Sequence, residues 1–399
     1  MTWDLTGKVA IVGLGHTKYT RPGASGRTAL SLALEAAINA CADAGISPRD
    51  IDGFVTYSAE SSDTYTMAQS LGIPNVRFMD RYSGGGESLA GTVHHAAHAV
   101  AAGTATYILC YRSLAGKLIR TQTGAKIIEA QPVGTGGGGG MRPDFLHPFG
   151  AFVPNQYYAM QARRHMIDFG TTSRQFGAIA VNGNKNAQRN PNAIHYGRPI
   201  TIDDHQNSRM VTDPYHLYDC TQEMDGAGAV LVTTVERARD LKSTPVFLTG
   251  AAEGAAPLKN DMLYNQMRHQ SRWNTAGMEE VAQELYIRAG VGPEGIDVAQ
   301  IFETFTGQAL MAIEDFGFAK RGEGGPFVES GAIDWQTGSL PMNTAGGGLA
   351  EGYLHGFNNL IEAVRQMRGE STSQVKDAET CLVTSGPSAM PSSALILNR

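Results

Sequence analysis

Apolar and polar positions alternate along this chain in a pattern that predicts strands and helices in the same order in both halves. Short apolar runs are typical of buried strands, and apolar residues three and four positions apart are typical of helices. In the first half the expected elements are a strand at 8–13, a helix at 28–44, a helix between Gly84 and Gly103, and a strand at 106–110. In the second half they are strands at 246–249, 301–305, 380–384 and 393–397, and helices at 278–289 and 356–368. This alternation favours parallel-rich sheets with helices on both faces.

A short motif occurs in both halves and indicates a duplication. Residues 44–52 read AGISPRDID, and residues 289–297 read AGVGPEGID. Each copy follows a helical pattern and precedes an apolar stretch, and Gly45 fits the position after a helix where a positive φ is needed. A looser pair, GGGES at 84–88 and GGGL at 346–349, precedes a second helix in each half. Self-similarity in the same order predicts a duplicated α/β domain with two helix starts at its centre.

An insertion of about residues 114–170 interrupts the first half. It contains the glycine-rich run 134–140 and the aromatic stretch DFLHPFG at 144–150. Two interpretations stay open, an exposed connector and a flap over an active-site mouth, because long loops in compact domains are often lids. We expect an N-terminal half at residues 1–240, which carries the insertion, and a C-terminal half at 241–399.

Composition narrows the class of protein. The chain has 399 residues, a hydrophobic fraction of 42% and a charged fraction of 18%, which are typical of a globular protein. Its net charge of −6 gives no reason to expect a nucleic-acid partner. No apolar run is long enough to span a membrane, and the N-terminus lacks the apolar core of a signal peptide. The four cysteines show no CxxC spacing, so we expect reduced thiols in a cytoplasmic protein and no metal site.

Several longer phrases resemble a known family. They are PITIDDHQNSR at 199–209, DCTQE at 219–223, NTAGGG at 343–348 and EGYLHG at 351–356. Together with the duplication they resemble the thiolase superfamily, more narrowly its sterol-carrier-protein branch and the thiolase-like steroid side-chain aldolases of bacteria. The resemblance implies an α/β thiolase fold, in which two βαβαβαββ halves form a five-layered αβαβα sandwich with an inserted loop domain. The reaction needs separate evidence, because this superfamily hosts several chemistries on one scaffold.

The first-half helix start lacks the residue on which thiolase chemistry depends. A thiolase carries a cysteine nucleophile there, since a helix N-terminus lowers the pKa of a thiol. The matching window, residues 82–91, reads YSGGGESLAG and holds no cysteine. Glu87 or Ser88 falls at about the nucleophile position, and the alignment does not separate them. Either one caps the helix, or Ser88 contacts the substrate; as a nucleophile Ser88 would need a base that the sequence does not specify.

The second-half helix start carries Tyr353 where thiolases of this branch have a histidine. In the aldolases that the chain resembles, a pair of tyrosines is thought to perform a retro-aldol cleavage, and Tyr353 matches one of them. A phenol donates a hydrogen bond to a carbonyl, or accepts a proton if its pKa is lowered. The other tyrosine belongs to a Tyr-Asp-x-Phe-Thr phrase, which here reads FETFT at 302–306. Phe302 removes that phenol, so the base is Glu303, His147 or a water, or there is none.

Other polar residues have assignments that the sequence leaves open. Asn343 resembles the superfamily asparagine that positions a water or an oxyanion, and its side chain could hold the enolate oxygen, with Gly347 beside the bound substrate. The alternative is a turn-forming asparagine. Tyr353 and His147 could instead be packed side chains, and His355 could only brace the helix start.

The resemblance implies a carbon–carbon lyase. The expected reaction is retro-aldol cleavage of a β-hydroxyacyl-CoA with a bulky, steroidal group, which gives a ketone and a short acyl-CoA such as propionyl-CoA. No covalent intermediate and no cofactor are expected. A homodimer joined with a small DUF35 subunit (a zinc ribbon plus an OB fold) in a heterotetramer is also implied. Two alternatives stay open: a non-catalytic scaffold that binds acyl-CoA, and a cysteine-independent acyltransferase. The sequence does not fix the exact substrate, the general base or the need for the partner.

Overall fold

A mixed sheet of nine strands, counted over the described residues, runs through the molecule. The computed structural model describes residues 5–82, 84–120, 126–129, 147–151, 153–254, 274–386 and 392–399. The strands follow the order β3-β2-β4-β9-β1-β10-β13-β12-β11. Their bounds are Val9–His16 (β1), Gly53–Tyr57 (β2), Phe78–Tyr82 (β3), Ile108–Leu114 (β4), Gly226–Thr234 (β9), Val246–Gly254 (β10), Val298–Gln300 (β11), Thr380–Thr384 (β12) and Ser392–Asn398 (β13).

The strand order has the same form in both halves of the sheet. β1 and β10 pair antiparallel where the halves meet, with Ala10 opposite Phe247. Outward from this pair each half places its last strand (β9 or β13), then β4 or β12, then β2 or β11. β9 and β13 run antiparallel to their neighbours, whereas β2 is parallel to β4 and β11 to β12. The duplicated α/β fold predicted from the repeat is confirmed.

The repeated motif forms the same local structure in both copies. α1 (Ala29–Ala44) ends at Gly45 with a φ of 77°, and α10 (Glu279–Ala289) ends at Gly290 with a φ of 67°. These left-handed conformations suit glycine because it has no β-carbon. Each glycine leads into a 3-10 turn, η1 (Pro48–Asp50) or η6 (Pro293–Gly295), and then into β2 or β11.

Helices cover the outer faces of the sheet and also fill the space between its two halves. α3 (Leu89–Ala101) contacts β9 and β2 of the first half and β10 and β13 of the second. α14 (Phe357–Arg368) contacts β12 on one side and β9 on the other. α1 packs outside the first half, and α10 and α11 (Thr306–Asp315) pack outside the second. The layers therefore alternate as helix, sheet, helix, sheet, helix, which the thiolase resemblance implied.

Alternate residues of each strand divide the apolar core between these layers. In β1, Val9 and Ile11 pack in the central core beside α3 and α14, whereas Ala10 and Val12 pack against α1. In β13, Leu395 and Leu397 join the central core, and Ala394 and Ile396 face the outer helices. This is the two-residue period of a strand that is buried on both faces.

The strand predicted at 301–305 is wrong, because β11 ends at Gln300. The next two backbone N–H groups bond to side chains instead of a neighbouring strand. Ile301 donates to Oδ1 of Asn343 at 2.8 Å, and Phe302 donates to Oγ1 of Thr384 at 2.9 Å. The chain therefore leaves the sheet at Ile301 and enters the site as a loop.

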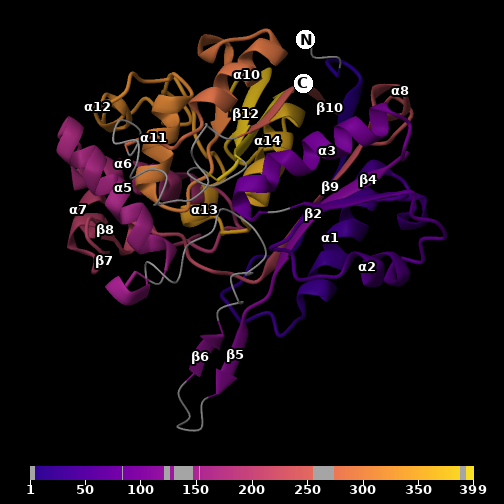
Figure 1. Ribbon diagram of the computed structural model, residues 1–399, viewed down its shortest axis with the longest axis horizontal. Helices are drawn as coiled ribbons and strands as arrows, with labels where there is room; N and C mark the ends of the chain where they lie inside the picture. The colour runs from indigo at the N-terminus through magenta and orange to yellow at the C-terminus, as the bar shows by residue number, and fades with distance from the viewer. Residues whose placement is uncertain are drawn as a thin grey trace.

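The described parts of the predicted insertion have more structure than a loop. β5 (Lys117–Arg120) and β6 (Lys126–Glu129) form a hairpin that projects from the body of the molecule (Figure 1). Pro154–Phe169 is a helix, α5, not part of a structureless segment. The run 134–140 lies outside the described residues. The remaining elements are α2 (Thr64–Ser70), η2 (Gly86–Ser88), η3 (His147–Phe149), α6 (Ser173–Ala187), α7 (Ile202–Asn207), β7 (Met210–Thr212), β8 (Tyr215–His216), η4 (Leu217–Asp219), α8 (Val235–Ala238), α12 (Gly324–Glu329) and α13 (Gly347–Ala350).

Within the described ranges, no helix combines the length and the apolar character that crossing a membrane requires.

Candidate active site

The starts of α3 and α14 meet at the ring of Phe302. A β-carbon placed on Gly86 would lie 2.5 Å from Phe302 Cζ and 3.6 Å from His355 Cβ. A β-carbon on Gly356, whose φ is 85°, would lie 2.6 Å from Phe302 Cδ2. Only glycine allows the ring to come this close on both sides. Phe302 is itself buried, so it fills the space between the two glycine-rich starts.

Tyr353 stands edge-on to two rings at this junction. Its ring centroid lies 6.0 Å from that of Phe302 and 5.0 Å from that of His355. The phenol forms a hydrogen bond with the side chain of Thr304, and the residue is partly exposed. Burial raises the pKa of Tyr353 to about 12, although the bond to Thr304 acts in the opposite direction. The phenol is therefore protonated at neutral pH, where it donates a hydrogen bond and needs a second group to take its proton.

The structure separates Glu87 from Ser88, which the sequence could not. Ser88 is fully buried, and its Oγ fills the space that a β-carbon on Gly84 would occupy. Glu87 is partly exposed. Among the charges that act on the Tyr353 phenol, that of Glu87 has the largest effect. Glu87 is therefore the more accessible residue of this pair, while contact of Ser88 with a substrate stays a prediction.

The α3 start is capped by the other half of the chain. Oγ of Ser385 accepts a hydrogen bond from the N–H of Ala90 at 2.7 Å, and Oγ of Ser393 accepts one from Gly91 at 3.0 Å. The Ser88 side chain makes no cap hydrogen bond to this helix. The capping alternative for Ser88 is therefore wrong, because serines of the second half already satisfy these donors.

Arg112 on β4 holds His355 beside Tyr353. Its Nη2 donates to Nδ1 of His355 at 3.2 Å, and its Nη1 pairs with Oε2 of the buried Glu60 at 3.3 Å. A guanidinium only donates, so Nδ1 of His355 accepts and the ring proton is assigned to Nε2. Burial and the Arg112 charge keep the pKa of His355 well below its usual value. The site therefore contains a neutral imidazole N–H next to a phenol.

Glu303 turns its carboxyl group toward the start of α13. It is buried and accepts hydrogen bonds from the N–H of Leu349 and from the amides of Asn343 and Asn359. A β-carbon on Gly347 would collide with Oε1 of Glu303, so this glycine makes room for the carboxyl group. Burial raises the pKa of Glu303 to about 8 despite these bonds. Glu303 as the base stays a prediction, and its hydrogen bonds fit a role in fixing the loop.

Asn343 ties its loop to the end of β11. Oδ1 accepts from the N–H of Ile301 and Nδ2 donates to the carbonyl of Ile301, both at 2.8 Å. The amide also bonds to Glu303. Its backbone φ of 49° is consistent with the turn-forming alternative. Both polar atoms of the side chain thus have protein partners, while the oxyanion role stays a prediction.

The structure brings some of the predicted site residues together. Gly348 lies between two of them: a β-carbon there would be 2.9 Å from the Glu303 carbonyl oxygen and 3.4 Å from Tyr353 Cδ2. His147 begins the η3 turn, but its side chain lies outside the described residues. Its role as a base therefore stays a prediction.

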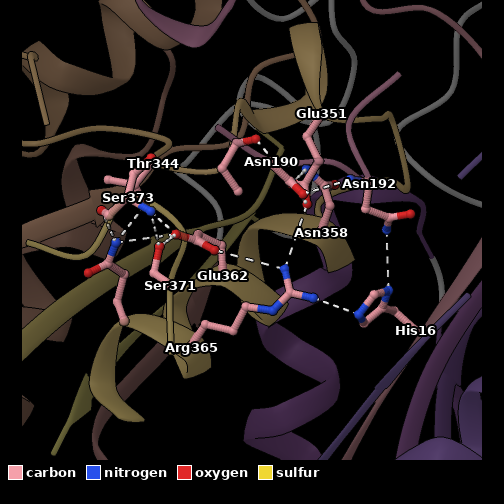
Figure 2. Close-up of polar contacts among 12 residues, drawn as sticks. His16, Asn190, Asn192, Thr344, Glu351, Asn358, Glu362, Arg365, Ser371 and Ser373 are labelled. Carbon is pink, nitrogen blue, oxygen red and sulfur yellow. Dashed lines mark hydrogen bonds and ion pairs between the residues drawn. The ribbon is translucent and has the colours of Figure 1, made fainter. Parts of the chain in front are cut away.

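A buried polar network anchors the segment just before Tyr353 (Figure 2). Arg365 on α14 lies between the carboxylates of Glu351 and Glu362, with a closest N···O distance of 4.0 Å to each. Its Nη2 donates to Nε2 of His16 at 2.6 Å. Burial raises the pKa of Glu351 to about 8, although the Arg365 charge lowers it. The network joins α14, β1 and the loop that carries Tyr353.

The chain is similar along almost its whole length to two bacterial steroid enzymes. It is 41% identical to a steroid side-chain-cleaving aldolase of Thermomonospora curvata, over 98% of each chain. It is 40% identical to a 17-hydroxy-3-oxo-4-pregnene-20-carboxyl-CoA lyase of Mycobacterium tuberculosis, over 98% of this chain and 100% of the lyase. The chain belongs to the thiolase-like steroid side-chain aldolases.

Structural comparisons agree with this family. The solved Ltp2-ChsH2(DUF35) aldolase matches with a TM-score of 0.88 and 40% identity, over 99% of this chain and 98% of that chain. Human mitochondrial 3-ketoacyl-CoA thiolase shares the fold, with a TM-score of 0.67 at 15% identity over 99% of each chain. The family model for a thiolase C-terminal domain-like region matches residues 261–399.

The four cysteines do not supply the nucleophile of a thiolase. Cys110 and Cys381 are buried in β4 and β12. Burial raises the pKa of Cys41 and of Cys220 to about 12, and raises the pKa of Cys110 and Cys381 as well. A nucleophilic cysteine needs a lowered pKa. In this aldolase the site therefore offers a phenol, an imidazole and a carboxyl group, not a thiolate.

Sequence reasoning missed Arg112 and Thr304. One sequence feature pointed to Arg112: it is the single charged residue within the apolar run of β4. An unpaired charge there would be costly, so a partner for Arg112 could have been expected. Thr304 lies in the 302–306 phrase, but no sequence pattern shows that its side chain would bond to Tyr353.

Proposed function

We propose that this protein is a retro-aldolase that cleaves a β-hydroxyacyl-CoA with a steroidal group into a ketone and a short acyl-CoA such as propionyl-CoA. The observation that carries the proposal is its full-length similarity to two enzymes named for this kind of cleavage, at 41% and 40% identity. The site supports it, because Tyr353 stands where the helix starts meet and no activated thiol is present.

The protein must contribute two catalytic functions to the cleavage. A group must take the proton of the β-hydroxyl as the carbon–carbon bond breaks, and donors must hold the enolate oxygen of the thioester. Tyr353 contacts the hydroxyl in this proposal. Nε2–H of His355, fixed by Arg112, donates to the enolate oxygen. The reaction is a proton and bond rearrangement, so we propose that it needs no cofactor and no covalent intermediate.

The test is product identification. The purified protein, alone and co-expressed with a ChsH2-type DUF35 subunit, is incubated with 17-hydroxy-3-oxo-4-pregnene-20-carboxyl-CoA. We expect equal amounts of a 17-ketosteroid and propionyl-CoA, and no acyl adduct in the intact mass of the protein. An acyl adduct would favour the acyltransferase alternative. An intact substrate in both preparations would leave only the scaffold alternative.

The proposed assembly is a homodimer that binds two DUF35 subunits in a heterotetramer. The support is the similarity to the Ltp2-ChsH2(DUF35) aldolase, whose name includes a DUF35 subunit. We also propose a reducing compartment such as the cytoplasm, which the four free cysteines support.

A further inference from the structure

We propose that Glu60 positions His355 for the cleavage and that it acts through Arg112. This inference rests on the lyase function proposed above, in which Nε2–H of His355 donates to the enolate oxygen. An arginine side chain is long, and its charge is costly to bury without a partner. Glu60 is the buried carboxylate that Arg112 contacts, so it decides where the guanidinium lies.

Four hydrogen bonds hold the Glu60 carboxylate in one place. Oε1 accepts from the N–H of Ser62 and from Oγ of Ser113, both at 2.7 Å. Oε2 accepts from the N–H of Ser113 at 2.6 Å and from Nη1 of Arg112 at 3.3 Å. Each of these partners is a donor, which suits a carboxylate because it only accepts. The carboxylate is therefore a fixed anchor for the guanidinium.

The Arg112 guanidinium is restrained on more than one side. Its Nη1 also donates to the carbonyl of Ala59 at 2.6 Å, next to Glu60 in the chain. The guanidinium lies over the ring of the buried Tyr57, with Cζ 5.6 Å from the ring centroid. Because Nη1 is engaged in this way, Nη2 is directed at Nδ1 of His355, at 3.2 Å. A lysine has no planar fork that could make both sets of contacts.

The backbone of His355 is in a conformation that its side-chain contacts help to maintain. Its φ is 50°, in the left-handed region that glycine adopts more easily. A residue with a β-carbon persists there where its surroundings restrain it. The bond from Arg112 is one restraint, and the ring of Tyr353, with its centroid 5.0 Å away, is another. The placement of the imidazole therefore depends on the position of Arg112.

The loop after β2, which carries Glu60, also contacts the first helix start. The N–H of Gly84 donates to Oγ of Ser58 at 3.0 Å, and the N–H of Ala59 donates to the carbonyl of Gly84 at 3.1 Å. β2 and β4 are parallel neighbours, so their carboxyl ends lie at the same edge of the sheet. Glu60 thus connects this loop, through Arg112 on β4, with the start of α14 in the second half.

These contacts decide which nitrogen of His355 carries the proton. A guanidinium only donates, so Nδ1 accepts from Arg112 and the proton of the neutral ring is on Nε2. In the other tautomer Nε2 would be an acceptor and could not donate to the enolate oxygen. Glu60 therefore affects the reaction without contact with the substrate, as a positioning residue.

Glu60→Gln tests this inference, with Glu314→Gln as a matched control. Glu314 is a buried carboxylate on α11 that pairs with His165. The readouts are kcat and KM for 17-hydroxy-3-oxo-4-pregnene-20-carboxyl-CoA, and the ¹⁵N chemical shifts of the His355 ring in protein labelled with ¹⁵N-histidine. His355→Ala identifies the His355 signals.

We expect Glu60→Gln to lower kcat by about 100-fold, which is typical of a catalytic group misplaced by about 1 Å, with little change in KM. The shifts of His355 should change from those of the Nε2–H tautomer to those of a mixture of both tautomers. Glu314→Gln should keep the kcat and the tautomer of the wild type.

A double-mutant cycle shows whether Glu60 acts through Arg112. If it does, Glu60→Gln combined with Arg112→Gln should be no slower than Arg112→Gln alone, because the second change removes nothing further. Losses of kcat that multiply would overturn the proposed route through Arg112.

The proposed role and the lyase function fail in different ways. If the wild type cleaves the substrate and a folded Glu60→Gln variant keeps its kcat and the His355 tautomer, the role of Glu60 is overturned while the lyase function stands. A proton on Nδ1 of His355 in the wild type overturns the role without any variant. If the wild type leaves the substrate intact, with and without the DUF35 subunit, the lyase function is overturned, whereas the ¹⁵N shifts still show whether Glu60 fixes His355. Thermal unfolding of each variant shows whether a loss of kcat reflects loss of the fold.

Discussion

The polar residues of the site differ in pKa, and these differences decide which of them can change charge near neutral pH. The phenol of Tyr353, with a pKa raised to about 12, stays protonated, and His355, with a lowered pKa, stays neutral. These two residues are therefore hydrogen-bond donors with a constant charge near neutral pH. Glu303, across Gly348 from Tyr353, is a group whose charge can change there, because burial raises its pKa to about 8. Residue by residue, the site fits proton transfer without a covalent step.

Removal of His355 should slow the reaction without weakening binding to the same extent. His355→Ala deletes the proposed donor to the enolate oxygen, and loss of one such donor typically costs about 100- to 1000-fold in kcat. The measurement is kcat and KM for cleavage of the steroid thioester. An unchanged kcat in a folded variant would contradict the proposed contact with the enolate.

The buried Glu351 should make stability depend on pH. Its pKa is raised to about 8 in the folded protein, above the unfolded value, so the folded state binds more protons between about pH 4.5 and 8. Stability from this group is therefore lost as the pH rises through that range, by up to about 1.4 kcal/mol per pH unit. Glu351→Gln should flatten the slope of the unfolding free energy between pH 5 and 8, measured by denaturant titration. An identical slope in the variant would contradict a protonated Glu351 at low pH.

At the scale of elements, the two glycine-rich helix starts set the geometry. Their glycines let one aromatic ring, Phe302, bridge the halves, and this ring in turn contacts Tyr353. The sequence predicted both starts and the repeat around Gly45 and Gly290, because glycines that follow a helical pattern have a clear local cause. It did not predict the end of β11, where side chains of Asn343 and Thr384, distant in sequence, take the backbone donors.

The candidate site could be predicted only in part, because several of its contacts join residues that are distant in the sequence. Tyr353 was identified because its phrase matches a family pattern. The choice between Glu87 and Ser88 depends on one residue of register in the short η2 turn, which sequence periodicity does not resolve. Arg112 and His355 are 243 positions apart in the sequence, so no local pattern predicts their contact.

A methyl group at the first helix start should disturb the packing of Phe302 between Gly86 and Gly356. Gly86→Ala places its β-carbon against the Phe302 ring, and overpacking of this kind typically costs about 1–3 kcal/mol. We expect a lower melting temperature and a lower kcat, since the ring contacts Tyr353. The smaller side chain in Gly86→Ala/Phe302→Leu should recover part of the stability in a double-mutant cycle. Strictly additive effects would contradict a direct contact between the two positions.

At the scale of the whole molecule, the duplication places one helix start from each half at a shared site. The first half supplies Arg112, and the second supplies Tyr353 and His355. The β1–β10 pairing and the contacts of α3 and α14 with both half-sheets hold these groups in register. A thiolase fold without an activated thiol thus retains a preformed site for a reaction that proceeds through an enolate.

The proposed assembly makes a separate prediction at this scale. Co-expression with a ChsH2-type DUF35 subunit should yield a complex with two copies of each chain. The measurement is the molar mass from size-exclusion chromatography with light scattering. A monomer that elutes apart from the DUF35 protein would contradict the proposed heterotetramer without bearing on the chemistry of the site.

A comparison of the wild type with Tyr353→Phe tests whether the cleavage depends on the phenol of Tyr353. The measurement is single-turnover formation of 17-ketosteroid and propionyl-CoA from 17-hydroxy-3-oxo-4-pregnene-20-carboxyl-CoA. We expect equal amounts of both products from the wild type and a rate lower by about 100-fold or more in a folded Tyr353→Phe variant. Equal rates in the two proteins would contradict this dependence.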